Sequence, residues 1–238
     1  MDMLGLLSFS PDGWGRPLLD GTWLTIKLAL ATLPAGLLLG LALALLIESG
    51  SRFLSAGAVA FATIVRALPE LLTIFIIYFG GQLLLQALVD AVLPGQSLDI
   101  DGFTAGLIAL ALVFGAFASE VFVAGLRAVP KGQEEAARSL GLGRGATFLL
   151  VIAPQLWRLA LPGLGNLWFM LLKDTALVSA ISLSELMRQT NLAVATTKQP
   201  LFFYAVTCTI YLLLSLLSGR LITVLERRAN SQYEVARQ

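Results

Sequence analysis

Five long apolar stretches, separated by shorter polar segments, dominate the chain. A transmembrane helix needs about 20 mostly apolar residues, and each stretch reaches that length. The stretches cover residues 24–47, 53–92, 103–126, 147–181 and 201–225. This pattern predicts an all-α integral membrane protein with five transmembrane helices.

Two of the stretches are too long for a single regular span. We interpret 53–92 as one long or kinked helix whose charged patch, around Pro69, lies toward one end. Proline fits the first turn of a helix better than its interior. In the fourth stretch we therefore expect a helix to start at Pro162, a membrane part at about 162–186 and a break near Lys173.

The composition supports a membrane location. Of the 238 residues, 57% are apolar and only 13% are charged, and the mean hydropathy is +0.84. Soluble domains average about 45–50% apolar and about 25% charged residues, so the few charges here cannot cover a soluble surface. The N-terminus has no basic segment and carries three aspartates before the first span, which does not favour a cleaved signal peptide.

Several classes of function are excluded by what the sequence lacks. It has no His, which excludes imidazole metal sites and His-dependent catalytic triads. Cys208 is its single cysteine, so no intrachain disulfide can form. No Gly-rich P-loop for ATP is present, and the net charge of +1 gives no reason to expect nucleic acid as a partner.

Basic residues are distributed unequally between the two sets of loops. One set holds Arg52, Arg127, Lys131, Arg138, Arg144, Arg227, Arg228 and Arg237. The other set holds Arg16, Arg188 and Lys198, together with most of the aspartates. By the positive-inside rule the first set is cytoplasmic, which predicts the N-terminus outside and the C-terminus inside. We expect an external N-terminal segment at 1–20, a transmembrane domain at 21–230 and a cytoplasmic tail at 231–238.

The largest predicted cytoplasmic segment joins the third and fourth spans. Its residues 133–140 are good helix formers, and Glu134 and Arg138 stand at i,i+4 in the favourable order. The glycines that follow end the helix. We expect Ala136 and Ala137 to expose a small flat face that another backbone can approach closely. The helix is therefore a candidate docking element, with an ordinary amphipathic loop helix as the alternative.

At this segment the sequence resembles the cytoplasmic EAA loop of ABC-importer permeases. The resemblance rests on Glu135-Ala136-Ala137, followed by Gly141 and Pro154. Further motifs that resemble the polar-amino-acid branch of the family are 66–70 (RALPE), 128–133 (AVPKGQ), 154–158 (PQLWR), 161–166 (LPGLGN) and 173–179 (KDTALVS). The resemblance covers about residues 20–230, and it is strongest to permeases for histidine, arginine, lysine, ornithine or octopine.

The resemblance implies a division of labour in the cell inner membrane. Such type I importers pair two permeases, identical or related, around a central pathway surrounded by membrane lipid. An external solute-binding protein delivers the amino acid substrate. Two ATP-binding subunits below the permeases bind ATP and Mg, so the resemblance implies that this chain is not an enzyme and holds no catalytic residue, metal or cofactor.

The resemblance also assigns a role to the predicted docking helix. Each ATP-binding subunit receives the EAA helix in a groove, so that nucleotide-driven closure reaches the spans as rigid-body motion. The implied coupling residues are Glu134, Glu135, Ala136, Ala137, Arg138, Leu140 and Gly141.

Ionisable residues at membrane depth are costly and usually face a cavity or a partner. As candidates for the substrate pathway we single out Glu70, Glu120, Asp174 and Thr175. Glu70 follows Pro69, where the helix loses a hydrogen bond. The resemblance implies that permeases for cationic amino acids tend to carry an acidic residue at this place, so we expect a polar, cationic substrate.

The same charges have a simpler interpretation as fixed ion pairs that hold the bundle together. Arg66 stands four residues before Glu70 and would neutralise it. Related permeases often carry an Arg three residues after the position of Glu120. This chain has Val123 there, and we expect Arg127 to take its place.

Two other classes of function stay open on the sequence alone. A stand-alone secondary amino acid transporter would need its own ion site and usually shows internal repeats, which are not evident here. A non-transporting scaffold would leave the carboxylates at membrane depth without a reason. A G-x-x-x-G pattern at Gly36 and Gly40 is better explained by packing within the subunit than by dimerisation.

Overall fold

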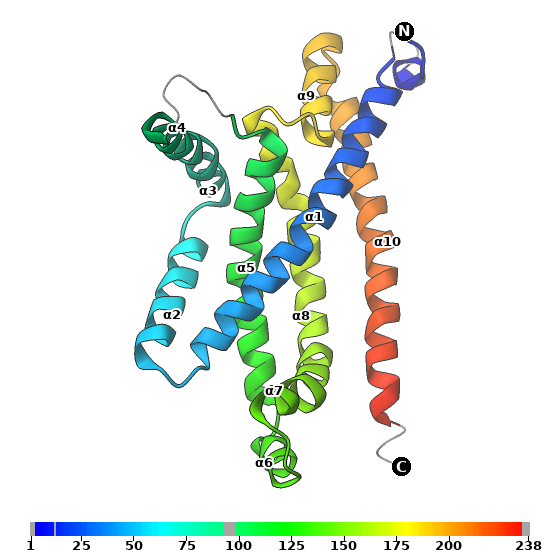
Figure 1. The fold of residues 1–238 in the computed structure, drawn as a ribbon. Helices are drawn as coiled ribbons and strands as arrows, with labels where there is room; N and C mark the ends of the chain where they lie inside the picture. The colour runs from blue at the N-terminus through cyan, green and yellow to red at the C-terminus, as the bar shows by residue number, and fades with distance from the viewer. Residues whose placement is uncertain (1–2, 12, 93–98, 235–238) are drawn as a thin grey trace.

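The structure is a computed structural model that describes residues 3–11, 13–92 and 99–234, and the regular elements within these ranges are helices (Figure 1). The long helices are α1 (Gly15–Ile47), α2 (Arg52–Ala67), α5 (Gly102–Ala128), α8 (Ala153–Asp174) and α10 (Pro200–Glu234). The shorter elements are η1 (Met3–Leu7), α3 (Glu70–Phe75), η2 (Ile76–Gly80), α4 (Gly81–Val92), α6 (Lys131–Ser139), α7 (Arg144–Thr147), η3 (Phe148–Ile152), η4 (Thr175–Ile181) and α9 (Leu186–Thr197). η2 and η3 are π-helical, whereas η1 and η4 are 3₁₀ helices.

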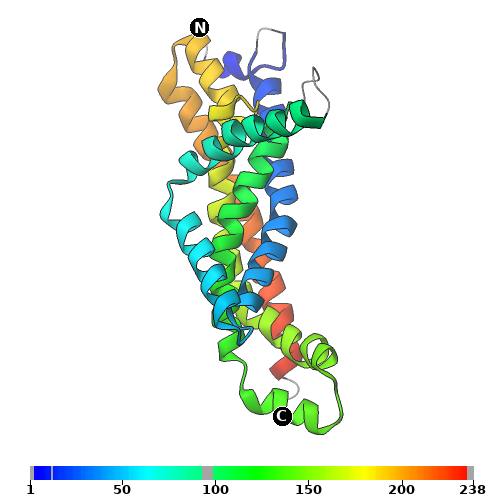
Figure 2. The same ribbon diagram turned by 60° about the vertical axis from the view of Figure 1, so that its left-hand side comes forward.

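The predicted number of spans is confirmed. Five helical segments in the described part of the chain are long and apolar enough to cross a membrane: Gly15–Ile47, Glu70–Ala91, Gly102–Ala128, Arg144–Ile181 and Pro200–Ala229. α9 and the start of α1 lie at one end of the bundle, hereafter the α9 end (Figure 1). α6 and the last turns of α10 lie at the opposite end, hereafter the α6 end (Figure 2). The first and last long helices therefore place the two ends of the chain on opposite sides of the bundle.

α5 is the centre of the bundle and packs against α1, α2 and α8. α1 crosses it closely because both helices carry small residues at the crossing. A Cβ atom on Gly36 would lie 2.5 Å from Cδ1 of Phe114, and one on Gly40 would lie 2.7 Å from Cβ of Ala118. The interpretation of the G-x-x-x-G pattern as packing within the subunit is confirmed.

The second apolar stretch is broken near its middle, whereas we expected its charged patch to lie toward one end. α2 ends at Ala67, Leu68 is extended with ψ 141°, and Pro69 follows with ψ 132°. Proline lacks an N–H group and drives the preceding residue out of the helical region, which explains the break. Beyond it, α3, η2 and α4 run on together at a steep angle to α2 (Figure 2). The predicted kink is confirmed, and the charged residues lie at the kink itself.

The prediction that Pro162 begins a helix is wrong. α8 runs through Pro162, and Pro154 occupies the first turn instead, where the missing N–H group costs no hydrogen bond. The apolar segment is Arg144–Ile181 rather than 162–186. The predicted break is confirmed, because α8 ends at Asp174 and continues as the 3₁₀ helix η4.

Candidate substrate site and coupling helix

α6 lies at the tip of the α6 end, between α5 and α7 (Figure 1). It begins after the extended Pro130 and ends before Gly141, whose φ of +84° is in the left-handed region that favours glycine. The N–H of Gly141 donates to the carbonyl of Arg138 (2.9 Å), and the N–H of Leu142 donates to the carbonyl of Ala137 (3.1 Å). These two bonds form a Schellman motif, so the glycine fixes the end of the helix.

The exposed face of α6 differs from the predicted one. Ala136 is exposed, but Ala137 is only 4% exposed. Successive helical residues point about 100° apart because a turn takes about 3.6 residues, so the two alanines cannot share one face. The expectation that both form a flat docking surface is wrong for Ala137. Leu140 is 82% exposed and gives this end of the helix an apolar contact point, while Glu134 and Arg138 form an ion pair of 2.7 Å.

A second ion pair braces the root of α6. Nη2 of Arg127, in the last turn of α5, lies 2.9 Å from Oε1 of Glu48, and its Nε donates to the same oxygen at 3.0 Å. Glu48 caps the end of α1. A cavity of about 460 Å³, lined in part by Lys131 and Glu134, lies beside this pair. The expectation that Arg127 pairs with Glu120 is wrong, because Arg127 forms its ion pair with Glu48 at the end of α1.

Glu120 forms its ion pair with Arg66. Nη1 of Arg66 contacts Oε1 of Glu120, and Nε of the same arginine donates to the carbonyl of Ala62 at 3.1 Å. The pair joins the last turn of α2 to α5, directly before the break at Pro69. The structure therefore pairs Arg66 with Glu120 and not with Glu70.

Glu70 and Asp174 face one another where the second and fourth stretches are broken. Glu70 opens α3, Asp174 ends α8, and α3 packs against η4. The two carboxylates interact repulsively, and the neighbouring Lys173 offsets part of this for Asp174, but neither carboxylate forms an ion pair with another described residue. No group of three or more Cys, Asp or Glu side chains in the described ranges is gathered as a metal ion would require. The arrangement is thus a pair of carboxylates, with Lys173 nearby, in which neither carboxylate forms an ion pair.

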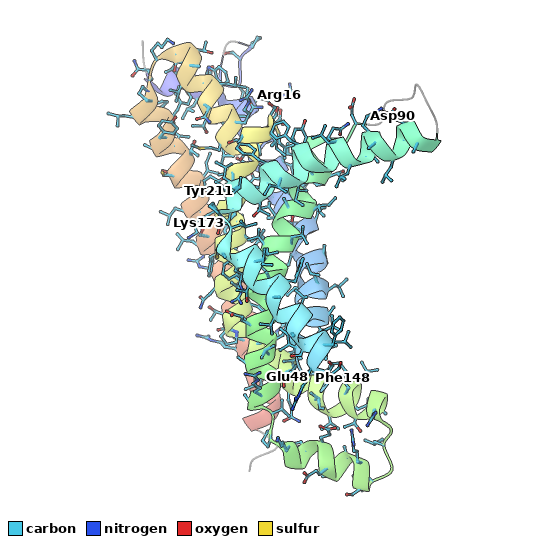
Figure 3. All side chains as sticks on the ribbon, turned by 90° about the vertical axis from the view of Figure 1, so that its left-hand side faces the viewer. Arg16, Glu48, Asp90, Phe148, Lys173 and Tyr211 are labelled. Atoms are coloured by element: carbon cyan, nitrogen blue, oxygen red, sulfur yellow. The ribbon has the colours of Figure 1, made fainter. Side chains whose placement is uncertain are left out.

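Thr175, the remaining predicted pathway residue, lies directly after Asp174. Its side chain is completely buried, and Oγ1 donates to the carbonyl of Leu172 at 2.7 Å. The label of Lys173 in Figure 3 marks this region on α8, just below Tyr211 of α10. The hydroxyl of Thr175 is therefore engaged with the backbone of the break.

Glu185 is a buried carboxylate that the sequence analysis did not single out. It is 0% exposed, and its side chain accepts hydrogen bonds from the first N–H groups of α9. In the sequence it lies in a polar connection, where a glutamate is ordinary. The signal that could have identified it is its place directly before a helix, where a side-chain oxygen can cap the helix.

Comparison with known proteins identifies the family. Residues 36–231 match the family described as "Binding-protein-dependent transport system inner membrane component". The arginine ABC transporter permease protein ArtQ of Escherichia coli K12 is 40% identical over 225 residues, which are 90% of this chain and 94% of the relative. The octopine transport system permease protein OccQ of Rhizobium meliloti is 36% identical, with 96% and 97% of the two chains covered. The histidine/lysine/arginine/ornithine permease HisQ of Salmonella typhimurium is 36% identical, with 91% and 94% covered.

Solved structures agree with this result. A crystal structure of an amino acid ABC transporter with histidines superposes with a TM-score of 0.78 at 32% identity, covering 96% of this chain and 99% of that one. The MetNI methionine ABC transporter, at 15% identity and a TM-score of 0.75, has the same fold. The resemblance found in the sequence is confirmed. The chain belongs to the family of inner membrane permease components of binding-protein-dependent ABC transport systems, and it is a multi-pass membrane protein that acts as a transport component.

Proposed function

We propose that the chain is the permease subunit of an ATP-driven importer that moves a cationic amino acid, of the arginine, lysine, histidine or ornithine type, into the cytoplasm by alternating access. The observation that carries this proposal is the pair of neighbouring carboxylates, Glu70 and Asp174, neither of which forms an ion pair with a described residue. The relatives named for arginine, for octopine and for histidine, lysine, arginine and ornithine support it.

The proposed substrate supplies the positive charge that this site lacks. A cationic amino acid such as arginine or lysine carries an α-ammonium group and a cationic side chain, which can contact the two carboxylates, and its own α-carboxylate leaves it a net charge of +1. Hydrogen bonds between charged groups are the strong ones, and they strengthen further where water is excluded. Glu70 and Asp174 belong to different breaks, so a substrate held between them joins α3 to the α8–η4 junction. We assign Thr175 to the same site as the residue that shapes the break.

Glu120, also predicted as a pathway residue, has a different role in this proposal. Its charge is already balanced by Arg66. We assign the pair to bracing α2 against α5 below the break, which keeps α3 in place while a substrate binds.

At the α6 end we propose the coupling interface. α6 docks into an ATP-binding subunit that holds ATP and Mg, and the exposed Leu140 supplies an apolar anchor. Its surface is formed by Glu134, Glu135, Ala136, Arg138 and Leu140, whereas Ala137 and Gly141 set the shape of the helix. The further proposed partners are a second permease, identical or related, and an external solute-binding protein.

This assignment sets the orientation of the chain. The α6 end is cytoplasmic and the α9 end is external, with an external segment at 1–20, a transmembrane domain at 21–230 and a cytoplasmic tail at 231–238. Residues 1–2, 12, 93–98 and 235–238 lie outside the described residues. A reporter fused after Gln238 is expected to read cytoplasmic.

The test neutralises each carboxylate in the complete importer. Glu70→Gln and Asp174→Asn keep the side-chain shape and remove the charge. With the binding protein and ATP supplied to proteoliposomes, arginine uptake is expected to fall by about one to two powers of ten, the worth of a charge-assisted hydrogen bond. Asp90→Asn is the matched control, because Asp90 is an exposed carboxylate on α4.

Complex yield and binding-protein-stimulated ATPase activity are measured alongside uptake, and both are expected to survive. Unchanged arginine uptake in both variants would contradict the proposed site. Uptake that continues without ATP would favour a stand-alone secondary transporter instead.

A further inference from the structure

Glu185 joins η4 to α9 at the α9 end and is completely buried. Its Oε2 accepts from the N–H of Met187 and its Oε1 from the N–H of Arg188, both at 2.8 Å. The hydroxyl of Thr25 on α1 lies 3.4 Å from Oε2 of Glu185 and accepts from the N–H of Leu186 at 3.2 Å. One carboxylate therefore caps α9 and connects its first turn to α1.

No cation balances this carboxylate among the described residues. The polar group that α10 presents to it is the hydroxyl of Tyr211, which also faces Thr25 and Thr175. This hydroxyl is buried without a hydrogen bond of ordinary length to a described residue. Burial raises the pKa of Glu185 to about 7. Burying a carboxylate is costly, so a buried carboxylate outside the proposed substrate site indicates a structural or functional role.

The backbone around Glu185 is packed as closely as its side chain. A Cβ atom on Gly21 of α1 would lie 3.0 Å from both the carbonyl carbon of Glu185 and Cα of Leu186. Leu186 belongs to a buried apolar cluster with Leu18 of α1 and Phe203 of α10. The junction is thus held between α1 and α10, and α9 cannot shift without moving it.

The same junction holds the C-terminal end of η4, and the proposed substrate site lies at the N-terminal end of this helix. η4 runs from Thr175, next to Asp174, to Ile181, and the left-handed Ser182 follows with φ +65°. It packs against α3 as well as against α1 and α9. A 3₁₀ helix has poorer hydrogen bonds than an α-helix, so its geometry depends on what holds its two ends.

We infer that Glu185 is a positioning residue for substrate binding: by fixing α9 to α1 it anchors η4, and thereby holds Asp174 opposite Glu70. This inference rests on the proposed function of Glu70 and Asp174. Tyr211 extends the anchor, because its hydroxyl lies between Glu185 and Thr175. The external helix α9 and the substrate site are therefore two ends of one connected element.

The experiment measures arginine uptake by the complete importer, with the KM and the maximal rate determined separately. Glu185→Ala removes the cap, and Glu185→Gln keeps the size and one acceptor oxygen. The KM is expected to rise roughly tenfold for the alanine variant and less for the glutamine variant, with the maximal rate and the complex yield preserved. Thr190→Val is the matched control, because it removes a buried hydrogen bond between α9 and Thr207 of α10, and one to the carbonyl of Leu186 within α9, while leaving the cap formed by Glu185 and the contact with Thr25 in place.

A double variant separates positioning from a general loss of structure. If Glu185 acts through Asp174, then Asp174→Asn combined with Glu185→Ala raises the KM no further than Asp174→Asn alone, since coupled residues are not additive. Additive effects, or Glu185 variants that behave like Thr190→Val, overturn the inference while leaving the proposed substrate site intact. If Asp174→Asn itself leaves the KM unchanged, the proposed function and this inference fail together. Where Glu185→Ala does not assemble, Glu185→Gln and Thr25→Val carry the same test.

Discussion

The substrate site and the α6 end differ in whether their carboxylates form ion pairs. Where α3 meets the junction of α8 and η4, the carboxylates of Glu70 and Asp174 repel one another and neither forms an ion pair with a described residue. At the α6 end, Glu48 pairs with Arg127 and Glu134 pairs with Arg138. That end also exposes an apolar side chain, because Leu140 is 82% exposed.

The difference indicates how each region recognises its partner. An unpaired charge at membrane depth is destabilising until a counter-charge arrives, so it favours binding of a small cation. Paired charges have little left to offer a partner, and surface ion pairs contribute only about 0–1 kcal/mol. In the proposed function, therefore, the α6 end would dock by shape and apolar contact, whereas the substrate site would bind by charge.

The largest expected effect tests whether Glu70 is truly unpaired. Glu70→Gln combined with Arg66→Gln is expected to leave arginine uptake per assembled complex reduced by about one to two powers of ten, as in Glu70→Gln alone, because Arg66 balances Glu120 and not Glu70. Restoration of uptake by the double variant would show that Arg66 balances Glu70, and would contradict the difference drawn between the two regions.

The matched control uses the same arginine with its observed partner. Arg66→Gln alone leaves Glu120 without a cation and is expected to lower the yield of assembled complex several-fold. Adding Glu120→Gln is expected to restore the yield, which is measured by size-exclusion chromatography of the purified complex.

A smaller effect is expected from the apolar anchor of α6. Leu140→Ala removes a contact worth at most about 1.5–3 kcal/mol when fully buried, so retention of the ATP-binding subunit and coupled ATP hydrolysis should fall roughly tenfold. Arg138→Gln on the same surface breaks an exposed ion pair and should lower both quantities much less than Leu140→Ala does. If the arginine variant has the larger effect, or if high salt releases the subunit, docking depends on charge after all.

The brace at the root of α6 is expected to have a still smaller effect. The side chains of Arg127 and Glu48 are 66% and 34% exposed, and an exposed pair contributes less than about 1 kcal/mol. Glu48→Gln should therefore shift the unfolding temperature of the complex by only a few degrees, and high salt should abolish the difference from wild type. A large shift that persists in high salt would mean that this pair is buried in the assembled importer.

The five spans and both breaks were predictable because they depend on local properties of the sequence. Apolar length identifies a span, and a proline in the middle of an overlong apolar stretch, as at Pro69, favours a break there. The prediction that Pro162 begins a helix was wrong because α8 begins earlier. Pro154 occupies its first turn, which leaves Pro162 inside the helix. The buried side of α6 was likewise set by packing, and Ala137 was therefore assigned wrongly.

The partners of the charged residues could not be predicted, because they depend on how distant helices align. Arg66 stands four residues from Glu70, yet it pairs with Glu120 on another helix. Arg127 reaches Glu48 in the same way, through the crossing of α1 and α5. No local feature of the sequence distinguishes these observed ion-pair partners from the partners that the sequence suggested.

The last expected effect concerns Glu185, which resembles the substrate carboxylates in forming no ion pair with a described residue but differs in accepting two backbone N–H groups. Burial raises its pKa from 4.5 to about 7. Between these values the folded protein holds a proton that the unfolded chain has lost, so stability falls as the pH rises through this range and levels off above it. Tyr211, the titratable group facing it from α10, does not change this expectation, because tyrosine ordinarily titrates near pH 10. The unfolding temperature of the complex, measured from pH 5 to 8, should fall more steeply for wild type than for Glu185→Gln, and Thr190→Val should follow wild type. Equal slopes for wild type and Glu185→Gln would show that the carboxylate stays ionised throughout, held by the N–H groups of α9 despite its burial.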